Sequence, residues 1–363
     1  MKIGIVARGL SERSGGVKQC IESSISALLK IDSENEYYIF HSHHDYVDKF
    51  PSAINIIIES SYKILWDYIF LPRELNKHKL DIVIFPKNVV PFFIKTKSIV
   101  VIHDLAYFMP ELNAYPFIDT IYMKVMIKSS LKRANMVVSV SSNTKNDIIK
   151  LIGTNETKIK VIHEAADSKY KIITDELQLN KIKRKYKLND QFIFYSGSLS
   201  PRKNMIRFLT AFSMIKDKIP HKLVLTGGKS HNDRNVHELI NQINDSVIKI
   251  GHIPDEDMPF IYNLADLFVY PSLYEGFGLP PLEAMACGCP VVSSNSSSLP
   301  EVVGDAAIMI NPYNVDEIAD GMYKILTNEN LRNNMIKKGL NRTQKLSWEK
   351  SAQSILELVE EVA

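Results

Sequence analysis

The sequence predicts an α/β protein of two doubly wound domains, each built on a parallel β-sheet covered by helices on both faces. Three observations support this fold class. The chain has 363 residues, which exceeds the size at which one hydrophobic core usually keeps growing. Short β-branched runs alternate with helical stretches along the first half. This alternation stops at a charged segment and then starts again in the second half.

Each half of the chain contains five predicted strands. Runs that are apolar on both faces are typical of strands buried between two helical layers, which indicates parallel sheets. Ligands of such sheets bind beyond the carboxyl ends of the strands, so the loops after strands are where a site is expected. The predicted strands are residues 3–6, 54–58, 82–85, 99–102 and 136–140 in the first half, and residues 192–195, 222–226, 247–250, 267–270 and 290–293 in the second.

The domain boundaries follow from the same alternation. Residues 1–167 form the predicted first domain, and the charged stretch at 168–190 is a predicted connector to a second domain at 191–345. Residues 346–363 are predicted to form a closing amphipathic helix, because Ser347 suits an N-cap and apolar residues follow it at helical spacing.

The composition is that of an ordinary globular protein. Hydrophobic residues make up 45% and charged residues 23% of the chain, and a net charge of +3 is too small for a whole-protein nucleic-acid binder. Three cysteines, two of them in a Cys287-Gly-Cys289 spacing too tight for a zinc or thioredoxin motif, favour reduced thiols. Without a signal-peptide pattern or an apolar run of ~18 residues, we expect a cytoplasmic protein that does not span a membrane.

The most informative stretch follows a predicted strand and opens a helix. It contains Glu275, glycines at 276 and 278, and Glu283. The glycines let backbone N–H groups approach a ligand closely, and the helix N-terminus beside them favours an anion or an array of hydroxyls. Glu275 can accept hydrogen bonds from sugar hydroxyls, and Glu283 can accept both hydroxyls of a ribose. The alternative is a solvated loop in which the glycines only turn the chain.

The stretch from Glu275 to Glu283 resembles the E-x7-E motif of retaining glycosyltransferases with the GT-B fold, in particular glycosyltransferase family 4. Pro271-Ser272 before it and the segments 288–292 and 299–304 after it are also similar to that family's pattern. The likeness covers essentially the whole chain and is densest at 191–310. It implies two Rossmann-like domains that face a cleft, with the nucleotide-sugar donor held mainly by the second and the acceptor on the side of the first.

The resemblance also implies roles for single residues in the second domain. Glu275 orients the hydroxyls of the donor sugar, and Glu283 holds the ribose. The backbone amides of four consecutive residues line the sugar and phosphate pocket, namely Gly276, Phe277, Gly278 and Leu279. The C-terminal helix at 346–363 is implied to return to the first domain.

A second signal is the adjacent pair Arg202 and Lys203, which follows the predicted strand at 192–195. Fixed cations in a partly dry cleft stabilise the charge that grows on a diphosphate as the sugar leaves. A surface basic pair is the alternative reading. Lys203 matches the phosphate-binding lysine of the family. Many members carry an arginine where this chain has Ser198, which leaves open whether Arg202 supplies the second positive charge.

Two further candidates lie in the first domain. The Gly15-Gly16 pair precedes a predicted helix, and His103 follows a predicted strand. Without the resemblance, a glycine pair is a flexible turn and a histidine at a strand end is a structural hydrogen-bonder. With it, Gly16 lets the backbone approach phosphate or acceptor, and His103 reaches toward the donor sugar. His163, near the end of this domain, is given a structural role.

The segment 124–133 places lysines at 124, 128 and 132 along one side of a predicted helix, interleaved with apolar residues. Such a helix can rest on an anionic bilayer, which would suit a lipid-linked acceptor. A solvated face on an ordinary packed helix is the alternative, and it is favoured. Peripheral contact with the inner face of the membrane is therefore kept as a hypothesis.

Together these features predict a retaining glycosyltransferase. The expected reaction moves a hexose from a nucleotide-diphosphate sugar to a glycan or lipid-linked glycan in surface polysaccharide synthesis. Because the sequence around Arg202 and Lys203 resembles that of mannosyltransferases, GDP-mannose is the first guess for the donor, which is a substrate and not a cofactor. No D-x-D cluster follows a strand, so no metal is expected and cations are assigned to the diphosphate.

Two other classes of protein fit part of this pattern. One is a non-catalytic nucleotide-sugar-binding protein, and the other is a GT-B relative of different reaction type, such as an epimerase. The joint presence of Glu275, Lys203 and His103 favours the enzyme.

Overall fold

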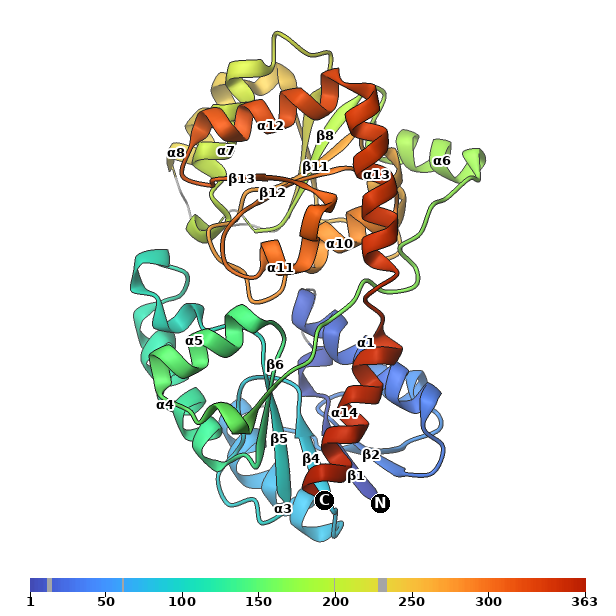
Figure 1. The fold of residues 1–363 in the computed structure, drawn as a ribbon. Helices are drawn as coiled ribbons and strands as arrows, with labels where there is room; N and C mark the ends of the chain where they lie inside the picture. Colours follow the sequence, from blue (N-terminus) through green and yellow to red (C-terminus); the bar gives the residue numbers. More distant parts are fainter. Residues whose placement is uncertain (12–14, 61, 199, 228–233) are drawn as a thin grey trace. The chain divides into compact units, whose positions relative to one another are not determined.

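The computed structural model describes residues 1–11, 15–60, 62–198, 200–227 and 234–363. The chain divides into two compact units (Figure 1). The first unit comprises Met1–Phe108, Tyr115–Glu164 and Ser347–Ala363, and the second comprises Met109–Ala114 and Ala165–Leu346. The predicted fold class is confirmed, because each unit is a parallel sheet between layers of helices.

The first unit contains a seven-stranded parallel sheet in the order β3-β2-β1-β4-β5-β6-β7. Its strands are β1 (Lys2–Val6), β2 (Glu36–His41), β3 (Ile54–Ile57), β4 (Ile82–Phe85), β5 (Lys97–Ile102), β6 (Met136–Ser139) and β7 (Ile159–Val161). β2 and β3 lie on one side of β1, and β4 to β7 lie on its other side. The strand order therefore reverses between β1 and β4, where open α/β sheets leave a crevice at the carboxyl ends of the strands.

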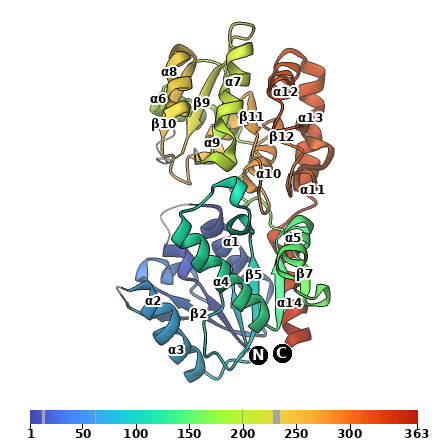
Figure 2. The ribbon, with the colours of Figure 1, turned by 90° about the vertical axis from the view of Figure 1, so that its left-hand side faces the viewer.

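Helices cover both faces of this sheet (Figure 1 and Figure 2). In β2, Ile39 joins a core formed with α1 and α14, while Phe40 joins a core on the other face with α3, α4 and α5. This alternation is the two-residue period of a strand buried on both faces. The helices are α1 (Gly16–Ile31), α2 (Lys63–Leu65), a π-helical turn (Trp66–Phe70), α3 (Leu71–Lys77), α4 (Phe117–Arg133), α5 (Ser142–Ile152) and α14 (Trp348–Val362).

The second unit repeats this plan with a six-stranded parallel sheet in the order β10-β9-β8-β11-β12-β13. Its strands are β8 (Phe192–Ser196), β9 (Lys222–Thr226), β10 (Val247–Gly251), β11 (Leu267–Tyr270), β12 (Val291–Ser294) and β13 (Ile308–Ile310). The order reverses between β8 and β11. This is again the position where a parallel α/β sheet binds its ligand.

Two helical layers cover the second sheet as well. Ile193 of β8 joins the core shared with α7, α8 and α12, while Phe194 packs against Tyr262 of α9 on the opposite face. The helices of this unit are α6 (Glu176–Tyr186), α7 (Met205–Ile215), α8 (Arg234–Gln242), α9 (Met258–Leu264), α10 (Leu279–Ala286), α11 (Leu299–Val303), α12 (Val315–Thr327) and α13 (Glu329–Thr343). The segment 168–190, expected to be a connector, contains α6 and belongs to the second unit.

All ten predicted strands are present, with ends within two residues of the prediction. Three strands were missed, namely β2, β7 and β13. The first of them, Glu36–His41, is rich in aromatic residues and has only one β-branched residue, so it lacks the pattern that identified the others. The remaining two are three-residue strands at or near the sheet edge. Strands that short carry almost no periodic signal.

The last helix, α14, is part of the first unit's core. Its residues Ala352, Ile355 and Val359 are buried with α1 and β1. Ser347 caps the helix as predicted, because its side chain accepts a hydrogen bond from the backbone N–H of Lys350 at 3.3 Å. The Ser351 hydroxyl donates to the backbone carbonyl of His163 at 2.5 Å, which joins α14 to the loop after β7.

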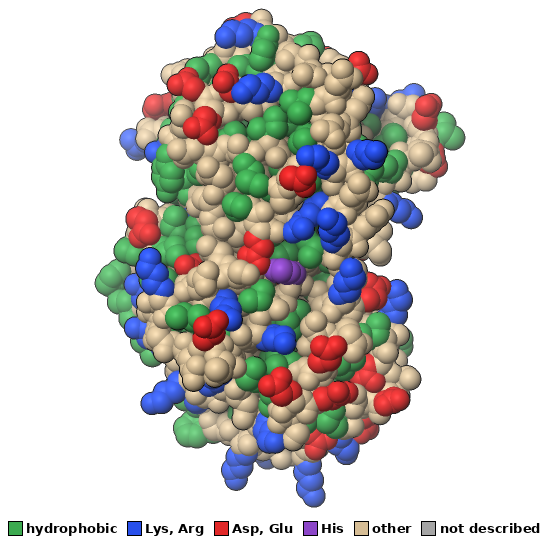
Figure 3. Space-filling view, viewed as in Figure 1, with side chains coloured by type: hydrophobic (Ala, Val, Ile, Leu, Met, Phe, Trp, Pro, Cys, Tyr) green, Lys and Arg blue, Asp and Glu red, His purple; other side chains and the backbone are tan. Residues whose placement is uncertain are grey.

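The surface carries mixed charge. On the face seen in Figure 3, side chains of Lys and Arg are interspersed with those of Asp and Glu. Among the described helices, none combines the length and the apolar character that crossing a bilayer requires.

We expect Ser347→Ala to lower the free energy of unfolding by about 1 kcal/mol, because the variant leaves an N–H of the first turn of α14 without its cap. Urea unfolding followed by circular dichroism measures this change. Ser354→Ala, which removes the same hydroxyl from the middle of α14, is the matched control. Equal stability of the two variants would show that the cap contributes nothing.

Candidate active site

Two loops of the second unit meet where its strand order reverses. One loop follows β8 and contains the 3-10 turn Pro201–Lys203, and the other follows β11 and leads into α10. β8 and β11 are parallel neighbours, so their carboxyl ends bring both loops to the same edge of the sheet. The predicted residues Arg202, Lys203, Glu275 and Glu283 all lie on these loops or on α10.

A buried ion-pair cluster joins the two loops. Lys203 Nζ donates to Glu275 Oε1 at 2.5 Å and to the hydroxyl of Tyr270 at 2.7 Å. Arg202 Nη1 donates to Glu275 Oε2 at 3.0 Å and to the carbonyl of Tyr274 at 3.0 Å. Each carboxylate oxygen of Glu275 is therefore paired with a different cation.

Asn204 holds the two loops in register. It has a left-handed backbone with φ of 60°, a conformation that asparagine tolerates better than most residues. Its side-chain amide donates to the carbonyls of Pro271, at 3.1 Å, and Pro312, at 2.6 Å. The backbone N–H of Leu273 also donates to the carbonyl of Arg202 at 2.8 Å. These bonds position the cations opposite Glu275.

The charges of the cluster decide the protonation state of Glu275, which is only 7% exposed. Burial alone would raise the pKa of this carboxyl. The positive charges of Arg202 and Lys203 outweigh burial and lower the pKa to about 2. Glu275 is thus a carboxylate at neutral pH and can only accept hydrogen bonds. Two cations against one carboxylate leave a net positive charge, which suits a ligand that carries both hydroxyls and an anionic group.

The glycine loop between Glu275 and α10 is fixed by Ser298, whose hydroxyl donates to the carbonyls of Glu275, at 3.0 Å, and Phe277, at 2.6 Å. Gly278 has a φ of +112°, and a Cβ there would lie 2.7 Å from Leu299 Cδ2. Only glycine satisfies both constraints. The loop residues Gly276, Phe277, Gly278 and Leu279 are all buried, and Gly278 forms the N-cap of α10.

Glu283 lies within α10, as the sequence predicts. Its Oε2 accepts a hydrogen bond from the hydroxyl of Tyr262 on α9 at 3.1 Å, and the residue is buried. The structure therefore brings three of the four predicted charged residues into one cluster and gives Glu283 a partner on the neighbouring helix.

In the first unit, His103 follows β5 as predicted, and both of its ring nitrogens face acceptors. Nδ1 lies 3.0 Å from Glu164 Oε1, and Nε2 lies 2.8 Å from the carbonyl of Pro86. Burial lowers the pKa of His103, but the Glu164 carboxylate outweighs it and the net pKa is raised. A ring that donates from both nitrogens is the imidazolium form. To contact a sugar, His103 would have to exchange one of these partners.

Gly16 is the first residue of α1, and a Cβ at Gly15 or Gly16 would meet no heavy atom within 4 Å. The space beside this helix start is therefore open. Among the described residues, Cys20, His103 and Glu164 form a set whose ligand atoms lie within 4.8 Å of one another. These thiol, imidazole and carboxylate donors are of the types that bind Zn²⁺.

Several residues of the site were missed from the sequence. Glu164 lies 61 residues from His103, and Tyr270 lies 67 residues from Lys203. Glu164 follows β7, which was not predicted as a strand. If β7 had been predicted, a search of the loops after strands would have included Glu164. Asn204 and Ser298 act through backbone carbonyls, and no spacing in the sequence indicates such contacts.

The chain matches two family models. Residues 178–342 match the model described as glycosyl transferases group 1, and residues 25–170 match the model described as Glycosyltransferase Family 4. O-antigen chain mannosyltransferase B of Escherichia coli is 35% identical over 259 residues, which are 70% of this chain and 67% of that protein. Serotype-specific mannosyltransferase WbdA of Escherichia coli is 29% identical over 282 residues. These residues are 75% of this chain but only 34% of WbdA, so this chain spans about a third of that protein's length.

Solved structures resemble the whole chain. Sucrose-phosphate synthase from Thermosynechococcus elongatus superposes with a TM-score of 0.79 at 18% sequence identity. The superposition covers 99% of this chain and 98% of the synthase chain. The Anabaena protein Alr3699/HepE, solved in complex with UDP-glucose, superposes with a TM-score of 0.79 at 17% sequence identity. The superposition covers 99% of this chain and 100% of the Anabaena chain. At these identities the likeness concerns the fold.

We expect the stability difference between wild type and Glu275→Gln to be largest near neutral pH and to shrink in acid. The pKa of Glu275 is lowered from 4.5 to about 2 on folding, so its stabilising contribution is full above pH 4.5 and is lost as the pH falls toward 2. Urea unfolding at several pH values between about 3 and about 7 measures the difference. Asp217→Asn, at a carboxylate that is 81% exposed, is the control. A constant difference below pH 4.5 would contradict the assignment.

We expect Glu164→Gln to lower the pKa of His103, because the carboxylate is what keeps that pKa raised against burial. The ring nitrogens of His103, followed by NMR over a pH titration, report this pKa directly. In the wild type the raised pKa stabilises the fold fully below the ordinary value of 6.5, and this contribution is lost as the pH rises through the folded value. An unchanged titration in the variant would refute the role of Glu164.

Proposed function

The chain belongs to the group 1 glycosyl transferases, and on this premise we propose that it moves mannose from GDP-mannose to a saccharide acceptor with retention of anomeric configuration. The observation that carries the proposal is the Glu275–Arg202–Lys203 cluster. It places an ionised acceptor of hydrogen bonds beside two cations at the strand-order reversal of the second unit.

The cluster suits the charge changes of sugar transfer. As the bond between the anomeric carbon and the diphosphate breaks, negative charge grows on the leaving oxygen and positive charge grows on the sugar ring. Arg202 and Lys203 are proposed to stabilise the diphosphate, in place of a divalent cation, while Glu275 binds hydroxyls of the sugar. Arg202 would thus supply the second positive charge, in a chain that has Ser198 where many relatives have arginine.

The proposed step needs no covalent bond to the protein. The acceptor hydroxyl attacks the anomeric carbon from the face that the diphosphate leaves, and the departing phosphate oxygen takes the hydroxyl proton. The glycine loop at 276–279 is proposed to provide amides to the sugar and phosphate, and Glu283 to accept the ribose hydroxyls. The roles of His103 toward the sugar and Gly16 toward phosphate or acceptor stay predictions from the resemblance.

Mannose and the polysaccharide acceptor are supported by the relatives. Two of them, from Escherichia coli, are mannosyltransferases, and one of these is described as acting on the O-antigen chain. We therefore propose a glycan or lipid-linked glycan acceptor in surface polysaccharide synthesis.

Glu275→Ala and Lys203→Ala should each lower kcat with GDP-mannose at least about 100-fold, the usual loss when a preorganised electrostatic contact to the transition state is removed. Nucleotide release is measured over a panel of nucleotide sugars, and NMR of the product gives its anomeric configuration. Release from GDP-mannose above the other donors, with retention, is the expected result.

Two residues in ion pairs at the surface of the second unit provide matched controls. Asp217→Ala and Lys338→Ala remove the same types of charge from surface ion pairs. Wild-type kcat in the Glu275 and Lys203 variants would refute the roles assigned to them. Inversion of the anomeric carbon would refute the retaining step.

A further inference from the structure

Three side chains of the first unit offer metal-binding atoms close to one another. Cys20 lies on α1, His103 follows β5 and Glu164 follows β7. One ligand atom of each residue lies within 4.8 Å of those of the other two, and within the described part of the chain no other group of His, Cys, Asp and Glu side chains comes together in this way. None of the roles proposed above explains why a thiol, an imidazole and a carboxylate meet here.

The spacing of these atoms is close to what a tetrahedral ion requires. Nitrogen and oxygen ligands lie about 2.0 Å from Zn²⁺ and a thiolate about 2.3 Å, which places neighbouring ligand atoms ~3.3 to ~3.5 Å apart. His103 Nδ1 and Glu164 Oε1 are 3.0 Å apart. Because no separation in the set exceeds 4.8 Å, a side-chain movement of about 1 Å brings the Cys20 thiol into the site.

The ring of His103 is already oriented as a metal ligand. Its Nε2 lies 2.8 Å from the carbonyl oxygen of Pro86, a contact in which Nε2 carries the proton. A metal-binding histidine typically donates its second ring N–H to a carbonyl in this way, which directs the other nitrogen to the ion. The backbone N–H of His103 also donates to Asn88 Oδ1 at 2.9 Å, so the main chain is held as well. Nδ1 is therefore the ligand atom.

Charge and ligand type select the ion. On binding, the ion replaces the proton on His103 Nδ1 and the proton of the Cys20 thiol, and both protons pass to solvent. A neutral imidazole, a thiolate and a carboxylate then surround a divalent cation, so the occupied site carries no net charge and is compatible with the burial of Cys20 and Glu164. A thiolate ligand favours Zn²⁺ over Mg²⁺ and Ca²⁺, which prefer oxygen ligands.

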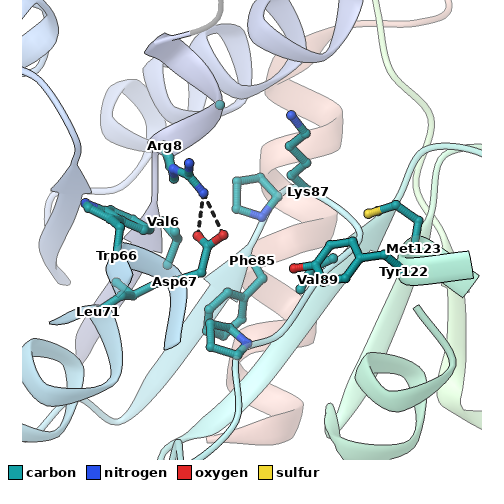
Figure 4. A pocket seen from close by; sticks show the side chains of 13 residues that line it. Val6, Arg8, Trp66, Asp67, Leu71, Phe85, Lys87, Val89, Tyr122 and Met123 are labelled. Atoms are coloured by element: carbon teal, nitrogen blue, oxygen red, sulfur yellow. Dashed lines mark hydrogen bonds and ion pairs between the residues drawn. The ribbon is translucent and has the colours of Figure 1, made fainter. Parts of the chain in front are cut away.

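The site adjoins the crevice of the first sheet. Pro86, which accepts from His103 Nε2, and the next residue, Lys87, line a pocket of about 330 Å³ at the reversal of strand order between β1 and β4 (Figure 4). In this pocket Arg8 Nη1 donates to both carboxylate oxygens of Asp67, each at 2.6 Å. A metal ion on His103 would therefore lie beside the position where a doubly wound sheet binds its ligand.

We propose that Cys20, His103 and Glu164 bind Zn²⁺ and that the bound ion inhibits sugar transfer. The metal site stands on the geometry of the first unit alone, whereas its inhibitory effect rests on the proposed function, in which His103 contacts the donor sugar. His103 reaches a sugar only by exchanging one of its ring partners. With Nδ1 on the ion and Nε2 on the Pro86 carbonyl, neither ring nitrogen is available, so the occupied enzyme transfers sugar more slowly.

Zinc binding to the full-length chain is measured by competition with a chromophoric chelator, and Co²⁺ serves as a spectroscopic probe. We expect one Zn²⁺ per chain, no displacement by excess Mg²⁺, and a thiolate-to-cobalt charge-transfer absorption. Cys20→Ala should weaken zinc binding at least about 100-fold, because losing a ligand costs more than losing an outer-shell partner, and should abolish the cobalt absorption. Cys289→Ala, at another buried cysteine, is the matched control.

A second variant guards against loss of the fold. Cys20→Ser replaces the thiol by a hydroxyl of similar size and should bind zinc as weakly as Cys20→Ala. Circular dichroism of the metal-free variants shows whether each is folded. Wild-type zinc affinity in either folded variant, or an unchanged cobalt absorption, would overturn the metal site and leave the proposed function untouched.

Inhibition is followed separately, as release of GDP from GDP-mannose. Zn²⁺ should lower kcat of the wild type at least about tenfold, the loss expected when one hydrogen-bonding group is withdrawn, and a chelator should restore it. The same free Zn²⁺ should leave Cys20→Ala near its own metal-free rate. Equal inhibition of both proteins, or zinc binding without loss of turnover, would overturn the inhibitory role. If no donor is cleaved with or without zinc, the proposed function fails and the inhibitory role with it, while the metal site stands or falls with the binding data.

Discussion

The two loops of the candidate active site are joined around one buried carboxylate. Glu275 is ionised in a place that excludes water, and this is stable only because Lys203 and Arg202 each satisfy one of its oxygens. The pairing works only if both loops reach the same edge of the sheet. The bonds of Asn204 and Ser298 to backbone carbonyls then become necessary parts of the site, although neither residue carries charge.

In both units, charged groups lie at the carboxyl ends of the strands, at the point where the strand order reverses. In the second unit this position holds the cluster around Glu275, and in the first it holds the Arg8–Asp67 ion pair with Lys87. Each place contains two cations and one carboxylate on a parallel sheet. The electrostatic arrangement in the two units is therefore similar, although the residues that build it come from different loops.

Much of this could be predicted from sequence. The fold class, ten strands and the positions of Glu275, Lys203 and His103 followed from periodicity, from the ends of strands and from family likeness. The pairing of Glu275 with Lys203 could not be predicted, because the two are 72 residues apart and spacing does not determine which side chains meet. Glu164 was missed for a related reason, since its strand β7 has only three residues. Tertiary contacts, and not local pattern, decide these positions.

The position of α14 has a consequence for biosynthesis. The core of the first unit contains Ile3 and Ile5 from the start of the chain and Ala352, Ile355 and Val359 from its end. During translation, the ribosome must therefore complete all of the second unit before the last helix is available to cover α1. The unit that is made first acquires its full core last, and until then its uncovered apolar face is a surface that nascent-chain chaperones can bind.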